Sequence, residues 1–136
     1  MILSRVKALV WIVRPGPEVL LLERPQRRGG GFHPVTGKSE AGEPVSESAR
    51  REALEETGLA GRLLDLGYHH SFADPRSGRP CEEHAFLLSV AAGSEPTLSS
   101  EHVAARWTRP EDAATSVRWP AHREALDRAI EAFRRA

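Results

Sequence analysis

Three glutamates on one side of a predicted helix constrain this chain more than any other feature of its sequence. Glu52, Glu55 and Glu56 lie in a segment, residues 44–57, whose ends and composition predict a helix. At roughly 100° per residue, their side chains share an arc of about 100° around the helix axis. Like charges at these spacings repel each other. A divalent cation would offset the repulsion, and hard, oxygen-seeking Mg²⁺ or Mn²⁺ suits a site built from carboxylates.

The ends and the apolar residues of the segment support this interpretation. Pro44 suits the first turn of a helix, and Gly58 suits the left-handed position just after the last turn. Val45, Ala49 and Ala53 recur at helical spacing, and their stripe partly overlaps the arc of the glutamates. We therefore expect the carboxylates at the margin of the core, where partial desolvation strengthens their interaction with a bound cation.

The helix belongs to a longer pattern that covers residues 37–59. Written with U for an apolar residue, the pattern is G-x5-E-x7-R-E-U-x-E-E-x-G-U, and every defined position is filled. The residues that fill it are Gly37, Glu43, Arg51, Glu52, Ala53, Glu55, Glu56, Gly58 and Leu59. With this signature the chain resembles the Nudix (MutT-like) hydrolase family, in which Ile, Leu or Val is more usual at the position of Ala53.

The resemblance implies a fold and an activity. Nudix proteins are α/β proteins with the Nudix fold, an α/β/α sandwich with a mixed sheet, and most of them use Mg²⁺ to hydrolyse a diphosphate linked to another moiety. By the family pattern, Glu52, Glu55 and Glu56 should ligate the metal ion and take part in catalysis. Mn²⁺ could substitute for Mg²⁺ as the cofactor.

The remaining residues of the signature are implied to support this site. Arg51 should orient one of the glutamates, which places it among the catalytic residues. Glu43 should support the site as a more distant carboxylate. Gly37 should open the loop before the helix, and Gly58 should end the helix.

Four residues that do not fill a defined position of the signature are candidates for the same site. Glu101 lies in a polar turn late in the chain, where Nudix enzymes often supply a carboxylate that binds metal or accepts the proton of the attacking water. The competing interpretation of Glu101 is an ordinary surface glutamate. Arg24 and Lys38 could bind substrate phosphate, with a solvated surface position as the alternative for each. Phe32 is the aromatic residue that we expect to contact the ring of the substrate.

The six histidines do not converge on a metal site in the sequence. His69 and His70 are adjacent on a predicted strand, so their side chains should point to opposite faces of a sheet. Cys81 and His84 lack the companion ligands of a zinc site. We interpret all six histidines as structural or surface residues.

Three further segments are similar to the dihydroneopterin triphosphate and dATP pyrophosphohydrolase branch of the family, namely residues 32–37, 100–107 and 119–125. Phe32 and Pro34 depart from the pattern of that branch, which leaves the identity of the bound ring open. The resemblance implies cleavage of a (deoxy)nucleoside triphosphate or of dihydroneopterin triphosphate to a monophosphate and pyrophosphate. ADP-ribose and dinucleoside polyphosphates are alternative substrates, and a Nudix-fold binding module without catalysis is a further alternative.

Length and composition predict a single domain that covers residues 1–136. Lys plus Arg equals Asp plus Glu at 19 each, so the charge gives no argument for binding to nucleic acid or to a membrane. The single Cys81 excludes an internal disulfide and fits the reducing cytoplasm, and no segment approaches the roughly 20 apolar residues of a membrane span. Nudix proteins are often dimers, so a homodimer is an option, although no residue of this sequence demands one.

The hydrophobic pattern alternates between strand and helix periods along the chain, as expected for a sheet covered on both faces. Pro15, Gly16 and Pro17 predict the first turn, and residues 74–78 predict a later one. Strands are predicted at residues 6–13, 19–22, 32–36, 63–72, 83–90 and 104–108, and helices at residues 44–57 and after Pro120.

Overall fold

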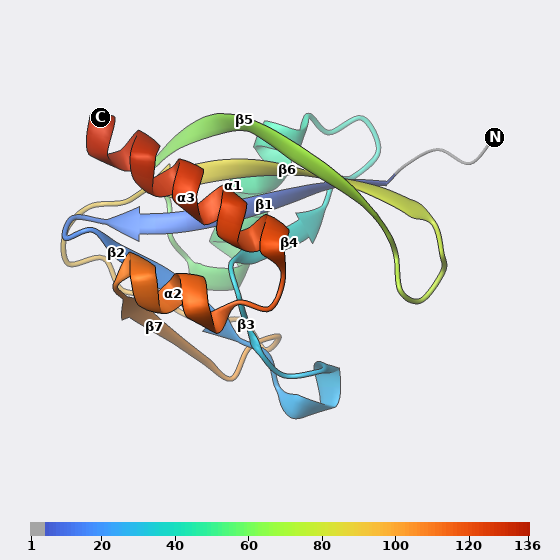
Figure 1. Cartoon of the computed structure of the whole chain (residues 1–136), viewed down its shortest axis with the longest axis horizontal. Helices are drawn as coiled ribbons and strands as arrows, with labels where there is room; N and C mark the ends of the chain where they lie inside the picture. Colours follow the sequence, from blue (N-terminus) through green and yellow to red (C-terminus); the bar gives the residue numbers. More distant parts are fainter. Residues whose placement is uncertain (1–4) are drawn as a thin grey trace.

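The computed structural model describes residues 5–136, in which strands and helices are interspersed along the chain (Figure 1). The strands are β1 (Arg5–Arg14), β2 (Glu18–Glu23), β3 (Phe32–His33), β4 (Val35–Lys38), β5 (Arg62–Ala73), β6 (Pro80–Ser89) and β7 (Ala104–Thr108). The helices are α1 (Val45–Thr57), α2 (Pro110–Ser116) and α3 (Pro120–Arg135), and Gln26–Arg28 forms a short 3₁₀ turn. No helix within residues 5–136 is both long and apolar enough to cross a membrane.

The strands of the described chain form one mixed sheet of seven strands. Its main order is β3-β2-β1-β6-β5, with β4 paired to β1 and β7 paired to β2. β1 runs parallel to β6, and the other pairs are antiparallel. β4 pairs with residues 7–10 of β1, whereas β2 pairs with residues 13–14 at the other end of the same strand.

Alternating side chains of β1 build a separate core on each face of the sheet. Trp11 belongs to the core that includes residues of α2 and α3, and Ile12 to the core that includes residues of α1. Figure 1 shows the two layers, with α3 in front of the sheet and α1 behind it. Full burial of a side chain such as Ile12 contributes about 1.5–3 kcal/mol. The predicted α/β/α sandwich with a mixed sheet is confirmed.

The helix that carries the glutamates ends at the predicted glycine. Gly58 has a φ of 70°, in the left-handed region, and its N–H donates to the Leu54 carbonyl at 2.8 Å. This C-terminal cap turns the chain away from α1 toward β5. The three glutamates therefore lie in the last two turns of α1, close to the point where the chain leaves the helix.

Two local features differ from the sequence predictions. α2 was not predicted, because it is seven residues long and buries only Ala113, too little to produce a helical hydrophobic period. The strand predicted at residues 32–36 is divided into β3 and β4 at Pro34, whose nitrogen has no hydrogen to donate to a neighbouring strand.

Candidate active site

Gly37 of β4 allows the side chain of Glu52 from α1 to lie directly against the strand. A Cβ atom added at Gly37 would lie 2.1 Å from Cδ and 2.3 Å from Cγ of Glu52, so only a hydrogen atom fits there. The φ of Gly37 lies outside the left-handed region, so glycine is needed at this position for space and not for backbone freedom. Gly37 lies inside β4, and the loop before α1 begins after the end of that strand.

Arg51 of α1 connects the glutamates to the preceding loop. Its Nε and one terminal nitrogen donate to the two carboxylate oxygens of Glu43, at 2.9 and 3.0 Å. The other terminal nitrogen donates to Glu52 at 2.8 Å and to Glu55 at 3.3 Å. A further hydrogen bond of 3.0 Å reaches the backbone carbonyl of Lys38. One guanidinium group therefore donates hydrogen bonds to three carboxylates and to the end of β4.

Glu43 is an ionised anchor of the loop. It accepts hydrogen bonds from Ser48 Oγ at 2.7 Å and from the backbone N–H of Glu40 at 3.0 Å, in addition to those from Arg51. These bonds, that from Arg51 first, lower the pKa of Glu43 to about 2. The hydrogen bonds of Arg51 to Glu43, and to a smaller extent its bond to Glu52, raise the pKa of Arg51. Both groups keep their charge at any working pH.

Glu56 is the buried carboxyl group of the site. Its side chain is 4% exposed, and its Oε2 atom has no hydrogen-bond partner within the described residues. Burial raises the pKa of Glu56 to about 9, with smaller contributions from the nearby carboxylates of Glu52 and Glu101. A buried carboxyl group with a free oxygen, next to other carboxylates, fits a hard divalent cation that would take the place of the proton.

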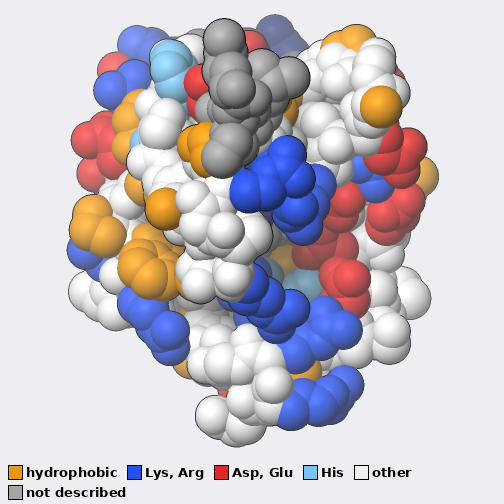
Figure 2. Space-filling view, turned by 90° about the vertical axis from the view of Figure 1, so that its right-hand side faces the viewer, with side chains coloured by type: hydrophobic (Ala, Val, Ile, Leu, Met, Phe, Trp, Pro, Cys, Tyr) orange, Lys and Arg blue, Asp and Glu red, His pale blue; other side chains and the backbone are white. Residues whose placement is uncertain are grey.

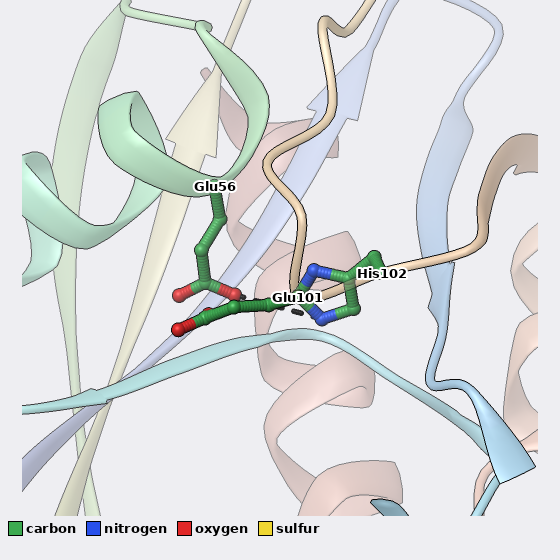
Figure 3. Close-up of side chains that lie close together, drawn as sticks. All are labelled: Glu56, Glu101 and His102. Carbon is green, nitrogen blue, oxygen red and sulfur yellow. Dashed lines mark ion pairs between the residues drawn. The ribbon is translucent and has the colours of Figure 1, made fainter. Parts of the chain in front are cut away.

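Glu101 and His102 approach Glu56 from the loop that precedes β7 (Figure 3). Each of these three residues offers one potential ligand atom, and the three atoms lie within 4.8 Å of one another. The backbone joins this loop to the end of α1, because the N–H of Ser99 donates to the Glu56 carbonyl at 3.3 Å. Glu101 is exposed, whereas His102 is buried, so the loop presents one carboxylate to solvent and one ring to the interior.

Two buried histidines next to Glu56 received no site role in the sequence analysis. His102 Nε2 lies 3.7 Å from Oε1 of Glu56 and 3.1 Å from Nε2 of His33. The position of His102 directly after Glu101 is the one signal that could have indicated it. His33 lies 69 residues away in the sequence from His102, and only the folded sheet brings the two rings together.

Arg24, directly after β2, lies near this group, whereas Phe32 of β3 points to the other face of the sheet. Arg24 is close enough for its charge to lower the pKa of both Glu56 and His102. The Arg106 guanidinium carbon lies 4.8 Å from the centre of the Phe32 ring, and the ring also packs against the core beneath α3. One face of Phe32 is therefore already in contact with a cation.

Lys38 and Glu55 lie at the margin of the group. Lys38 contributes its backbone carbonyl to Arg51, and strand alternation directs its exposed side chain to the face of the sheet opposite Gly37. The side chain of Glu55 is 58% exposed and contacts Arg51. The structure therefore brings Glu56 and Glu101 together, with Glu52 beside Glu56 and the exposed Glu55 at the margin.

The surface on this side of the molecule is hollowed (Figure 2). Asp and Glu side chains gather on one side of the hollow, Lys and Arg side chains on the other, and a histidine is visible between them. Carboxylates attract a cation and guanidinium groups match phosphate oxygens, so a hollow with both signs of charge fits a phosphate chain bound through a metal ion.

A second group of titratable side chains lies on the face of the sheet that α3 covers. The buried carboxylate of Glu83 is 2.8 Å from His70 Nε2, 3.8 Å from His122 Nε2 and 4.0 Å from Lys7 Nζ. Burial lowers the pKa of His122 to about 4. Unlike Glu56, this carboxylate is surrounded by donors, which explains its burial without any bound ion.

The sequence profile of the NUDIX domain family matches residues 3–129, and the chain belongs to this family. Over 118 residues it is 39% identical to an octanoyltransferase of Myxococcus xanthus, a match that covers 84% of this chain and 33% of that protein. It is 29% identical over 117 residues to the oxidized purine nucleoside triphosphate hydrolase of Mus musculus, with 86% and 74% of the two chains covered.

The fold is similar to that of the dihydroneopterin triphosphate pyrophosphohydrolase of E. coli, with a TM-score of 0.82 and 24% sequence identity. That match covers 96% of this chain and 99% of the other. The chain spans only about a third of the length of the Myxococcus protein. The chain therefore belongs to the Nudix family and has the fold of this solved structure.

Proposed function

We propose that this protein is a Mg²⁺-dependent Nudix pyrophosphohydrolase that cleaves a (deoxy)nucleoside triphosphate or dihydroneopterin triphosphate to a monophosphate and pyrophosphate. The observation that carries the proposal is Glu56, a buried carboxyl group with a partnerless oxygen beside Glu52 and Glu101. Such a group is costly to bury, and ligation of a cation offsets the cost. The intact signature on α1 gives the same assignment from the sequence.

In this proposal Glu52, Glu55, Glu56 and Glu101 supply the ligands. When bound, Mg²⁺ would neutralise charge on the phosphate oxygens and lower the pKa of a bound water. Glu101 or Glu52 would accept the proton of the attacking water, and Arg51 holds Glu52 in place through its 2.8 Å hydrogen bond. In-line attack at phosphorus then releases pyrophosphate.

Substrate binding is assigned to the basic side of the hollow. Arg24 lies near Glu56 and would bind the phosphate chain with two hydrogen bonds. Phe32 would contact the ring of the substrate with the face that Arg106 leaves uncovered. Lys38 is retained as a further candidate ligand for the phosphate chain, with its exposed side chain on the face of the sheet opposite Gly37.

The substrate class is tested by a hydrolysis screen with identified products. Nucleoside triphosphates, deoxynucleoside triphosphates, dihydroneopterin triphosphate, ADP-ribose and diadenosine polyphosphates are incubated with the protein and Mg²⁺ or Mn²⁺. Oxidised purine nucleoside triphosphates are added to the screen because the mouse relative is named for them. Release of pyrophosphate from one triphosphate would support the proposal. AMP and ribose 5-phosphate would instead identify an ADP-ribose hydrolase. No turnover with either metal would favour a binding module.

Composition supports proposals about the cellular location and the substrate class of the enzyme. We propose that residues 1–136 act as one domain in the cytoplasm, in line with the single Cys81, which is buried and unpaired. Equal numbers of acidic and basic residues favour a small-molecule substrate over nucleic acid. A homodimer is open to test by light scattering.

Mg²⁺ binding should release a proton. Because the pKa of Glu56 is raised to about 9, its carboxyl group is protonated at about pH 7, and a cation bound by its oxygens must displace that proton. Calorimetric titration with Mg²⁺ in two buffers of different ionisation enthalpy should show about one proton released per ion, and affinity should rise with pH. A binding enthalpy that is the same in both buffers would contradict this assignment.

A further inference from the structure

We infer that His33 and His102 form a positioning pair, in which His33 fixes the ring of His102 and His102 holds the Glu56 carboxylate and the loop that carries Glu101. The inference rests on the proposed metal site at Glu56. It assigns a function to two buried residues, neither of which belongs to the signature on α1. Both act through Glu56 and Glu101, so they are positioning residues and not metal ligands.

Hydrogen bonding defines which nitrogen of each ring carries a proton. His33 Nδ1 contacts the carbonyl oxygen of Pro34, which can only accept, so Nδ1 of His33 must carry the hydrogen. In a neutral ring the Nε2 atom of His33 is then a bare acceptor. The 3.1 Å contact between the two Nε2 atoms therefore requires that His102 Nε2 carries a hydrogen and donates it to His33.

Burial keeps both rings neutral, as this arrangement requires. Exposure is 4% for His33 and 9% for His102. Loss of hydration at this degree of burial disfavours the charged imidazolium form of each ring. Two protonated rings at this distance would repel each other, and a cation in the site would disfavour them further.

The same N–H of His102 faces the carboxylate of Glu56. His102 Nε2 lies 3.7 Å from Glu56 Oε1, so the N–H that His102 donates to His33 also attracts this carboxylate oxygen, as the longer arm of a shared contact. Glu56 Oε1 is directed to His102, which leaves Oε2 free of protein partners. Groups that hydrogen-bond to a metal-ligating carboxylate fix its orientation, and their loss typically weakens metal binding or activity 10–100-fold.

The pair also holds the second end of the loop. On the N-terminal side of Glu101, the loop is bound to α1 through the Ser99 N–H and the Glu56 carbonyl. His102, by contrast, joins the loop to β3 through His33. Glu101 lies between these two attachments, so its exposed carboxylate is carried on a backbone that is fixed on both sides.

The test separates hydrogen bonding from packing by paired substitutions. His33→Leu removes the acceptor at Nε2, whereas His33→Gln keeps an acceptor at a similar distance from the backbone. His102→Leu removes the donor, whereas His102→Gln keeps one. His84→Leu is the control, because it makes the same replacement of histidine by leucine on β6, outside the pair. Mn²⁺ affinity is measured by electron paramagnetic resonance, kcat and KM by steady-state kinetics, and Tm by calorimetry.

We expect both leucine variants to bind Mn²⁺ 10–100-fold more weakly and to lose kcat in the same range, with KM for the substrate nearly unchanged. The glutamine variants should keep most of the Mn²⁺ affinity, and the double leucine variant should be no worse than either single one, because the two rings act as a unit. If His33 and His102 only filled space in the fold, the glutamine variants would lose as much Mn²⁺ affinity as the leucine variants.

The inference is overturned if folded leucine variants bind Mn²⁺ like the wild type, if glutamine fails to restore binding, or if the two leucine effects add. A wild-type protein that neither binds Mn²⁺ nor hydrolyses any substrate would refute the proposed function itself. A wild-type protein that does both, with unaffected leucine variants, would refute only the positioning pair.

Discussion

Replacement of Glu56 by glutamine should lower kcat by roughly 10³-fold while the protein remains folded. The amide has nearly the same shape as the protonated carboxyl group, but it cannot carry the negative charge that a divalent cation requires. A loss of about 4 kcal/mol in transition-state stabilisation corresponds to this factor. Single-turnover kinetics in saturating Mg²⁺ measures the loss in the chemical step.

The stability of the same variant should respond to pH in a defined direction. The folded-state pKa of Glu56, about 9, lies above its ordinary value of 4.5, so the folded wild type holds this proton more tightly than the unfolded chain. Without metal, wild-type stability should therefore fall as pH rises from 4.5 to about 9, and Glu56→Gln should lack this contribution. Urea unfolding at several pH values tests the difference.

Glu47→Gln is the matched control, because Glu47 is an exposed glutamate in the first turn of the same helix. It loses the same charge and should keep wild-type kcat within about twofold. If Glu56→Gln turned over substrate as well as Glu47→Gln does, the metal assignment of Glu56 would be wrong.

The signature helix and its surroundings show how far a sequence can define a site. The spacing of Glu52, Glu55 and Glu56 predicted a helix with all three carboxylates on one arc, and Gly58 predicted its end; the structure has both features. These predictions succeeded because they depend on local periodicity and on caps within one element. A sheet covered on both faces followed from the alternation of strand and helix periods, which is also a local property, and the resemblance to the Nudix family implied the α/β/α sandwich.

Features that depend on contacts between distant residues were not accessible in this way. No spacing relates His33 to His102, and only the antiparallel pairing of β2 with both β3 and β7 brings the two histidines to one place. The different burial of Glu56 and Glu55 is another example. These two residues are neighbours in one helix, but the side chain of Glu56 is 4% exposed and that of Glu55 is 58% exposed. Helical spacing defines an arc, whereas the loop before β7 decides which part of the arc is covered.

The role of Gly37 shows the same limit for a residue inside the signature. Sequence reasoning expected it to open the loop before α1, but the structure places it in β4, where the Glu52 side chain occupies the space of a Cβ atom. Because its backbone conformation is open to any residue, a substitution at Gly37 should act on Glu52 and leave the strand intact.

Gly37→Ala should therefore reduce kcat by roughly 10²-fold with only a small change in stability. The added methyl group would collide with Cγ and Cδ of Glu52, which belong to a flexible side chain and can move away. A displacement of about 1 Å in a catalytic group is enough for a loss of this size. Steady-state kinetics and thermal unfolding of the same preparation measure the two effects.

Gly61→Ala is the matched control with the opposite expected result. A Cβ atom at Gly61 would lie 2.2 Å from the backbone carbonyl oxygen of Ser89, which cannot move without disturbing β6. This variant should lose stability by about 1–3 kcal/mol and keep its kcat at temperatures where it is folded. In a Glu52→Ala background, Gly37→Ala should have no further effect on kcat, since the side chain it displaces is gone. An additional loss there would show that Gly37 is needed for a reason other than the close approach of Glu52.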